Sequence, residues 1–195
     1  VRVNFKVTEM LYSDDYSDIW KDFCKYNTSI EIYKEIVEIF YDDLILIYPE
    51  LKDKIDEYLE RDKIDIKSEE ITGDFFNQQF QFCYNTPVTK VSSNRRIHHD
   101  NLDKLISGLL YLRLVKDDST GGDLQIYKQK DGIDLSKISC NLRYDVYPKL
   151  ENQFDISNIV KYSKNTLVMF INSNKSFHSI SDRCVTRIPR RFFNY

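Results

Sequence analysis

The sequence predicts an α+β fold in which helices come first and a series of short strands follows. Apolar residues recur at three- and four-residue spacing through the first third of the chain, as in amphipathic helices. From about residue 72 they alternate with polar residues or form short apolar runs, as in strands. Strands in such number favour a sandwich or a barrel. We therefore expect one domain over residues 1–195, with residues 1–71 mostly helical and residues 72–195 rich in strands.

Two amphipathic stretches make up the helical segment. In "NTSIEIYKEIVEIFYDDLILIY" the apolar residues share one face. Thr28 followed by Glu31 predicts a capping box at the start of this helix. Pro49 ends the helix or opens the next one, which "PELKDKIDEYLERD" continues. The charged residues opposite the apolar face predict a solvated surface.

The second part of the chain contains several segments with the pattern of strands. "DFFNQQFQFCYN" and "GGDLQIYK" alternate, "ISGLLYLRLV" and "NTLVMFIN" are apolar runs typical of buried strands, and "RRFFNY" is the last strand. Gly121 and Gly122 predict a turn with positive φ. The polar residues 129–161 are expected to form an insertion with little regular structure.

Composition and charge argue against several classes of protein. No run approaches the roughly 20 apolar residues that a membrane helix needs, and we recognise no signal peptide. The net charge of −3 does not predict a nucleic-acid partner. The four cysteines form no C-x-x-C pair, which argues against a thiolate zinc site and predicts reduced thiols in the cytoplasm. The oligomeric state is not predicted, and the missing initiator Met leaves open that the chain is a trimmed piece.

Two of the three histidines stand next to an aspartate in "RRIHHDN". In an extended segment His98 and Asp100 share a face, whereas His99 points away. His178 follows a buried strand and can supply a third ligand for a divalent metal. Two histidines and one carboxylate leave three positions of an octahedron open, as non-haem Fe(II) oxygenases require. An exposed His–Asp pair is the commoner meaning of H-x-D, so the motif alone leaves both interpretations open.

With the surrounding segments included, residues 76–195 resemble the 2-oxoglutarate/Fe(II)-dependent dioxygenase superfamily, specifically its prolyl-4-hydroxylase-like branch. The motifs that carry the resemblance follow the order of the family: "FCYN", "HHDN", "GLLYLR", "GGDLQIY", "NTLVMFINSNKSFHSI" and "RRFFNY". The resemblance implies a double-stranded β-helix (jelly roll) barrel with N-terminal buttressing helices. It also implies hydroxylation of a C–H bond in a peptidyl-proline, an amino acid or another small substrate, with release of succinate and CO2.

The resemblance also implies the cofactors and where they bind. Fe(II) is held by His98, Asp100 and His178, with 2-oxoglutarate and O2 as cosubstrates and ascorbate as a further cofactor to test. The distal carboxylate of 2-oxoglutarate needs a cation, which is Arg190 where "RRFFNY" begins. Arg187 is the second candidate, although "IP" follows it and breaks the strand pattern.

Two tyrosines occupy further family positions. Tyr111 in "LLYLR" donates its hydroxyl to the same carboxylate or is a core tyrosine, and Tyr84 in "FCYN" stands where the family often has a pocket tyrosine. Substrate specificity is expected to come from loops over residues 85–95 and 129–161, which contain no cluster that identifies a ligand.

Two other functions compete with the oxygenase. A cupin-type metal enzyme would use the same three ligands without 2-oxoglutarate, and a buried Arg190 argues against it. The third hypothesis is a non-catalytic barrel used for binding. The complete set of metal ligands argues against it: His98, Asp100 and His178.

Overall fold

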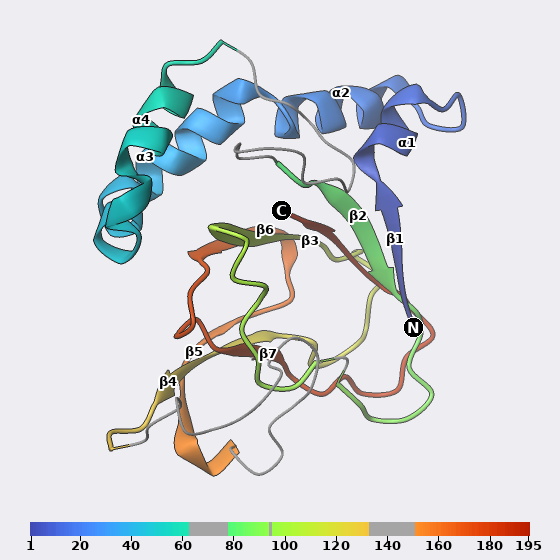
Figure 1. The fold of residues 1–195 in the computed structure, drawn as a ribbon. Helices are drawn as coiled ribbons and strands as arrows, with labels where there is room; N and C mark the ends of the chain where they lie inside the picture. The colour runs from blue at the N-terminus through green and yellow to red at the C-terminus, as the bar shows by residue number, and fades with distance from the viewer. Residues whose placement is uncertain (63–77, 94, 133–150) are drawn as a thin grey trace. The chain divides into compact units, whose positions relative to one another are not determined.

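The structure is a mixed α+β fold with two antiparallel sheets (Figure 1). This computed structural model describes residues 1–62, 78–93, 95–132 and 151–195. One sheet has five strands in the order β1-β2-β8-β3-β6, and the other has three in the order β5-β4-β7. The elements are β1 (Arg2–Lys6), α1 (Val7–Tyr12), α2 (Asp18–Asn27), α3 (Ile30–Ile47), η1 (Pro49–Leu51), α4 (Lys52–Leu59), β2 (Gln81–Asn85), β3 (Ile106–Leu112), β4 (Leu124–Gln129), η3 (Glu151–Gln153), β5 (Phe154–Val160), β6 (Lys164–Ile171), β7 (His178–Ile180) and β8 (Arg190–Asn194).

The chain is divided into two compact units by the contacts among its Cα atoms. The strand unit comprises Val1–Arg2 and Tyr84–Phe192, and the helical unit comprises Val3–Cys83 and Phe193–Tyr195. Among the described residues, no helix has both the length and the apolar character needed to cross a membrane.

In the helical unit, the N-cap of α3 lies one residue after the predicted capping position. The hydroxyl of Ser29 accepts a hydrogen bond from the backbone N–H of Ile32 (3.4 Å), which makes Ser29 the N-cap. Thr28 instead donates its hydroxyl to the carbonyl of Cys24 (2.8 Å) at the end of α2. The prediction of Thr28 as the cap is therefore wrong, because its hydroxyl is hydrogen-bonded to the last turn of α2. Pro49 opens η1, which was one of the two predicted alternatives.

Aromatic rings fill the core of the helical unit. Phe193 is completely buried and stacks on Phe80 with ring centroids 4.5 Å apart. Phe23, Phe82 and Trp20 surround Phe193 at 5.1, 5.3 and 5.9 Å between centroids. Tilted and stacked pairs at such distances add to the stability that burial alone provides. The alternation of Phe80 and Phe82 along the sequence thus reflects packing in this unit.

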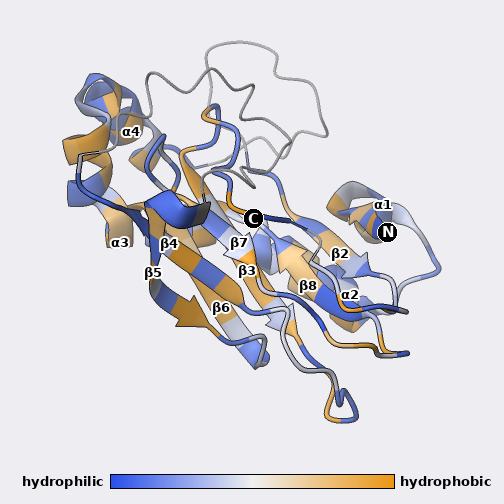
Figure 2. Ribbon diagram, turned by 90° about the horizontal axis from the view of Figure 1, so that it is seen from below, coloured by the Kyte–Doolittle hydropathy of each residue, from blue (hydrophilic) through white to orange (hydrophobic). Residues whose placement is uncertain are grey.

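In the strand unit, two layers of strands face each other, with β3 and β6 in one layer and β4, β5 and β7 in the other (Figure 1, Figure 2). Strand β3 pairs antiparallel with β6, and β4 pairs antiparallel with both β5 and β7. The predicted strands "ISGLLYLRLV", "NTLVMFIN", "GGDLQIYK" and "RRFFNY" are confirmed as β3, β6, β4 and β8. The expected burial of β6 is wrong, because its residues are exposed or only partly buried. Strand β7, which carries His178, thus lies next to β4, the central strand of the three-stranded sheet.

Strand β5 lies where the sequence predicts irregular structure. Residues 154–160 fall inside the expected insertion 129–161 but form a regular strand on β4, so that part of the prediction is wrong. Strand β5 contains both hydrophobic and hydrophilic residues (Figure 2), but the alternation breaks at Ser157–Asn158 and Ile159–Val160. Only Phe154 is buried, so the apolar signal is weak. Residues 133–150 of the expected insertion, and Phe76 in the first predicted strand, lie outside the described residues.

A turn with positive φ precedes β4, as predicted from the glycine pair. Gly121 and Gly122 have φ of +75° and +77°. A Cβ on Gly121 would lie 1.8 Å from the backbone oxygen of Asp182, which no side chain can tolerate. The close approach of these two backbones positions the segment that follows β7 against the start of β4.

Candidate metal centre

The two histidines of the candidate centre, His98 and His178, are paired through their backbones. Their residues form an antiparallel bridge in which each N–H donates to the carbonyl of the other, at 2.9 and 2.8 Å. Residues paired in this way project their side chains to the same side. The imidazole centroids are 4.3 Å apart, so two histidines separated by most of the strand unit's sequence meet at one point.

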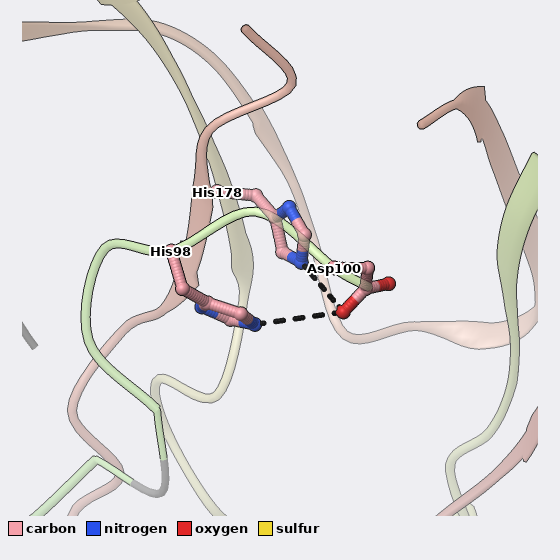
Figure 3. Close-up of side chains that lie close together, drawn as sticks. All are labelled: His98, Asp100 and His178. Atoms are coloured by element: carbon pink, nitrogen blue, oxygen red, sulfur yellow. Dashed lines mark ion pairs between the residues drawn. The ribbon is translucent and has the colours of Figure 1, made fainter. Parts of the chain in front are cut away.

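Asp100 completes the cluster from the same segment as His98 (Figure 3). Its Oδ1 lies 3.8 Å from the Nε2 atoms of both His98 and His178, and the three ligand atoms all lie within 4.8 Å of one another. Ligands about 2.1 Å from one ion on a face of an octahedron are about 3 Å apart. The ligand atoms therefore need to approach one another by about 1 to 2 Å to share an ion, which side-chain rotations can supply.

Hydrogen bonds fix which nitrogen of each imidazole faces the cluster. The Nδ1 of His98 lies 2.7 Å from the carbonyl oxygen of Arg96, and the Nδ1 of His178 lies 2.9 Å from that of Ser176. A carbonyl oxygen only accepts, so both Nδ1 atoms carry the proton and both Nε2 atoms present a lone pair. Backbone carbonyls that orient histidines in this way are a regular feature of metal sites in proteins.

The electrostatics leave the cluster with two neutral imidazoles and one carboxylate near neutral pH. Burial, together with the neighbouring His178, lowers the pKa of His98 to about 4. Burial also lowers the pKa of His178, which Asp100 partly opposes. For Asp100 burial acts to raise the pKa, but the two histidines and the nearby Ser107 outweigh it, and the pKa is lowered. Such a set has the charge and the lone pairs to hold a divalent cation.

A cation that the sequence reasoning missed lies at the edge of the cluster. The Nη1 of Arg95 is 2.9 Å from the Nε2 of His98 and 3.4 Å from Oδ1 of Asp100. Arg95 donates to the same lone pair that a metal would use, so the guanidinium and a metal ion exclude each other at that atom. The only sequence signal is a basic residue shortly before the H-x-D motif, which is too common to be informative.

His99 does not belong to the cluster, as the two-residue period of an extended segment predicts. It is buried, its Nδ1 lies 2.7 Å from the backbone oxygen of Asp100, and its ring packs edge-on against Phe177 at 5.8 Å.

The arginine and the tyrosine expected to bind 2-oxoglutarate lie together in the strand unit. Arg190 and Tyr111 are 1% and 0% exposed. The guanidinium carbon of Arg190 lies 4.8 Å from the ring centroid of Tyr111, 4.9 Å from that of Tyr162 and 4.8 Å from that of Phe192. The Tyr111 hydroxyl interacts with the Arg190 guanidinium, whereas the Nε and Nη2 of Arg190 have no hydrogen-bond partner among the described residues.

The other two candidate residues are more accessible to solvent. Arg187 is exposed in the loop before β8, and Tyr84 is half-buried in β2. Of the two arginines that the sequence proposes for the cosubstrate, only Arg190 is buried among aromatic rings.

The chain matches no protein-family model and no curated protein sequence. Any functional assignment therefore depends on the chemistry of the residues in the strand unit.

Proposed function

We propose that this protein is an Fe(II)- and 2-oxoglutarate-dependent oxygenase that hydroxylates a C–H bond and releases succinate and CO2. The convergence of His98, Asp100 and His178 is the single observation that carries the proposal. The proposal includes the jelly-roll double-stranded β-helix as the finer description of the two antiparallel sheets.

The donor set fits a ferrous ion. Two imidazole nitrogens and one carboxylate oxygen suit Fe(II), and three ligands from one side leave the opposite side open for small molecules. Bound iron would supply the activation of O2 at the expense of 2-oxoglutarate. The protein's own contribution is to hold His98 and His178 in the Nδ1-protonated form and to keep Asp100 ionised, so that all three offer lone pairs to the metal.

Arg190 and Tyr111 are proposed to bind the distal carboxylate of 2-oxoglutarate. Burying a guanidinium without an acceptor is costly, and a carboxylate supplies the acceptors that its donors lack. This buried cation also favours an oxygenase over a cupin-type enzyme with the same ligands, because such an enzyme needs no carboxylate partner there.

The proposed substrate is a peptidyl-proline, an amino acid or another small molecule, as the family resemblance implies. A cytoplasmic location is proposed because Cys24, Cys83 and Cys184, the cysteines among the described residues, are free thiols.

Formation of succinate tests the proposal. The purified protein is incubated with Fe(II), 2-oxoglutarate, O2 and ascorbate, with a panel of proline-containing peptides and amino acids, and succinate is measured. We expect iron-dependent succinate from the natural protein and none from Asp100→Ala. Asp103→Ala, which removes an exposed carboxylate nearby, is the control and should behave like the natural protein. Full activity of Asp100→Ala would exclude the ligand assignment.

A further inference from the structure

A second buried arginine, Arg183, lies beside Arg190. The exposed fraction of Arg183 is 2%, and that of Arg190 is 1%. Both side chains pass close to Gly122: a Cβ on this glycine would lie 3.1 Å from the Cδ of Arg183 and 3.5 Å from the Cδ of Arg190. Two guanidinium side chains therefore converge on one region of the strand unit.

The backbone and one nitrogen of Arg183 are held firmly. Its N–H and carbonyl pair with those of Ser92, at 3.0 and 3.2 Å. Its Nη2 donates to the carbonyl of Ile188 at 3.0 Å. The remaining nitrogens, Nε and Nη1, are buried and have no partner among the described residues. The side chain is thus fixed in a position that leaves two donors unused.

Donors exceed acceptors in this region. The unpartnered donors are Nε and Nη1 of Arg183 and Nε and Nη2 of Arg190. The Asp117 carboxylate interacts electrostatically with Arg183, and its Oδ2 makes no hydrogen bond within the described part of the chain. Buried polar groups are nearly always satisfied, so this surplus calls for an anion with several acceptor oxygens.

We propose that Arg183 is a second guanidinium that binds the distal carboxylate of 2-oxoglutarate together with Arg190. The inference rests on the proposed function and extends it to a residue that no sequence motif marks. A planar carboxylate offers four lone-pair directions, which two guanidiniums can fill with parallel hydrogen bonds. Asp117 balances part of the added positive charge without occupying the donors.

Gly122 gains a specific role from this arrangement. Its φ of +77° already favours glycine, and a Cβ would come within 3.0 Å of Cγ and 3.1 Å of Cδ of Arg183. The absent side chain of Gly121 leaves room for the backbone oxygen of Asp182. The absent side chain of Gly122 leaves room for Arg183, which we assign to the carboxylate.

Binding of two matched 2-oxo acids to the full-length Fe(II) protein without oxygen tests the assignment. One probe is 2-oxoglutarate, and the other is 2-oxopentanoate, which has the same chain length and lacks the distal carboxylate. Dissociation constants are measured by calorimetry for the natural protein, Arg183→Gln, Arg183→Lys and Arg190→Gln. Lys128→Gln, which removes an exposed positive charge from β4, is the control. Arg183→Lys retains the charge and serves if Arg183→Gln fails to fold.

We expect both Arg183 variants to bind 2-oxoglutarate about 10- to 100-fold more weakly, the effect of losing charge-assisted hydrogen bonds. Their affinity for 2-oxopentanoate should stay within about twofold of the natural protein's, which a merely structural role would not predict. Unchanged 2-oxoglutarate binding in folded Arg183→Lys, with loss of binding in Arg190→Gln, would overturn the inference and leave the proposed function intact. No binding of 2-oxoglutarate to the natural protein would overturn both.

Discussion

Acid should destabilise the metal-free protein in a pH range that identifies the histidine cluster. In the folded chain, burial and His178 lower the pKa of His98 from 6.5 to about 4. The unfolded chain therefore takes up a proton on this residue at a higher pH than the folded chain does. The stability that the neutral imidazole contributes is complete above about pH 6.5 and is lost as the pH falls towards 4.

The size of the effect follows from the shift in pKa. One pKa unit corresponds to about 1.4 kcal/mol, so the shift of His98 amounts to about 3 kcal/mol over the whole range. About 2.5 kcal/mol of this is lost by about pH 4.5. The pKa of His178 is also lowered, which acts in the same direction. The pKa of Asp100 is lowered from 3.8, so its own protonation falls below this range.

Urea unfolding followed by circular dichroism, with a chelator present, measures this loss. The free energy of unfolding is determined between about pH 7 and about pH 4.5 for the natural protein and for His98→Gln, whose side chain does not titrate. We expect the natural protein to lose about 2 kcal/mol more than the variant over this range. Equal losses in the two proteins would refute the claim that His98 is buried as a neutral imidazole.

Three further changes test other parts of the structure. Arg95→Ala should tighten binding of Mn(II) or Fe(II) severalfold in calorimetry, because it removes the guanidinium that donates to the Nε2 of His98. Unchanged affinity would show that Arg95 does not compete with the metal for this nitrogen. Phe193→Ala should lower the free energy of unfolding by about 3–5 kcal/mol, since it empties the centre of the aromatic core, and a loss below about 1 kcal/mol would contradict that packing. Gly121→Ala should fail to accumulate as folded protein because its Cβ overlaps the oxygen of Asp182, and a normal melting temperature would contradict the close approach.

The sequence predicts those parts of the fold that local pattern determines. Continuous apolar runs predict β3 and β6, although the side chains of β6 are exposed or only partly buried. The glycine pair predicts the positive-φ turn, because glycine adopts this conformation without strain. Strand β5 is missed because most of its side chains are exposed, so its pairing with β4 rather than its composition makes it a strand.

Local pattern also predicts only part of the candidate site. The alternation in "HHD" correctly separates His99 from His98 and Asp100, since extended backbone sets the direction of side chains locally. The pairing of His98 with His178 depends on the register between distant segments, which no local pattern specifies. Arg183 is missed for a related reason: its burial arises from the space left by Gly122, a contact between segments that lie far apart in the chain.

Visible absorption of the anaerobic protein with Fe(II) and 2-oxoglutarate tests the central claim most directly. A 2-oxo acid that chelates protein-bound ferrous iron gives a weak charge-transfer band. We expect this band in the natural protein, its loss in Asp100→Ala, and its appearance only when both iron and 2-oxoglutarate are present. A natural protein that binds iron but shows no band at saturating 2-oxoglutarate would contradict the oxygenase assignment.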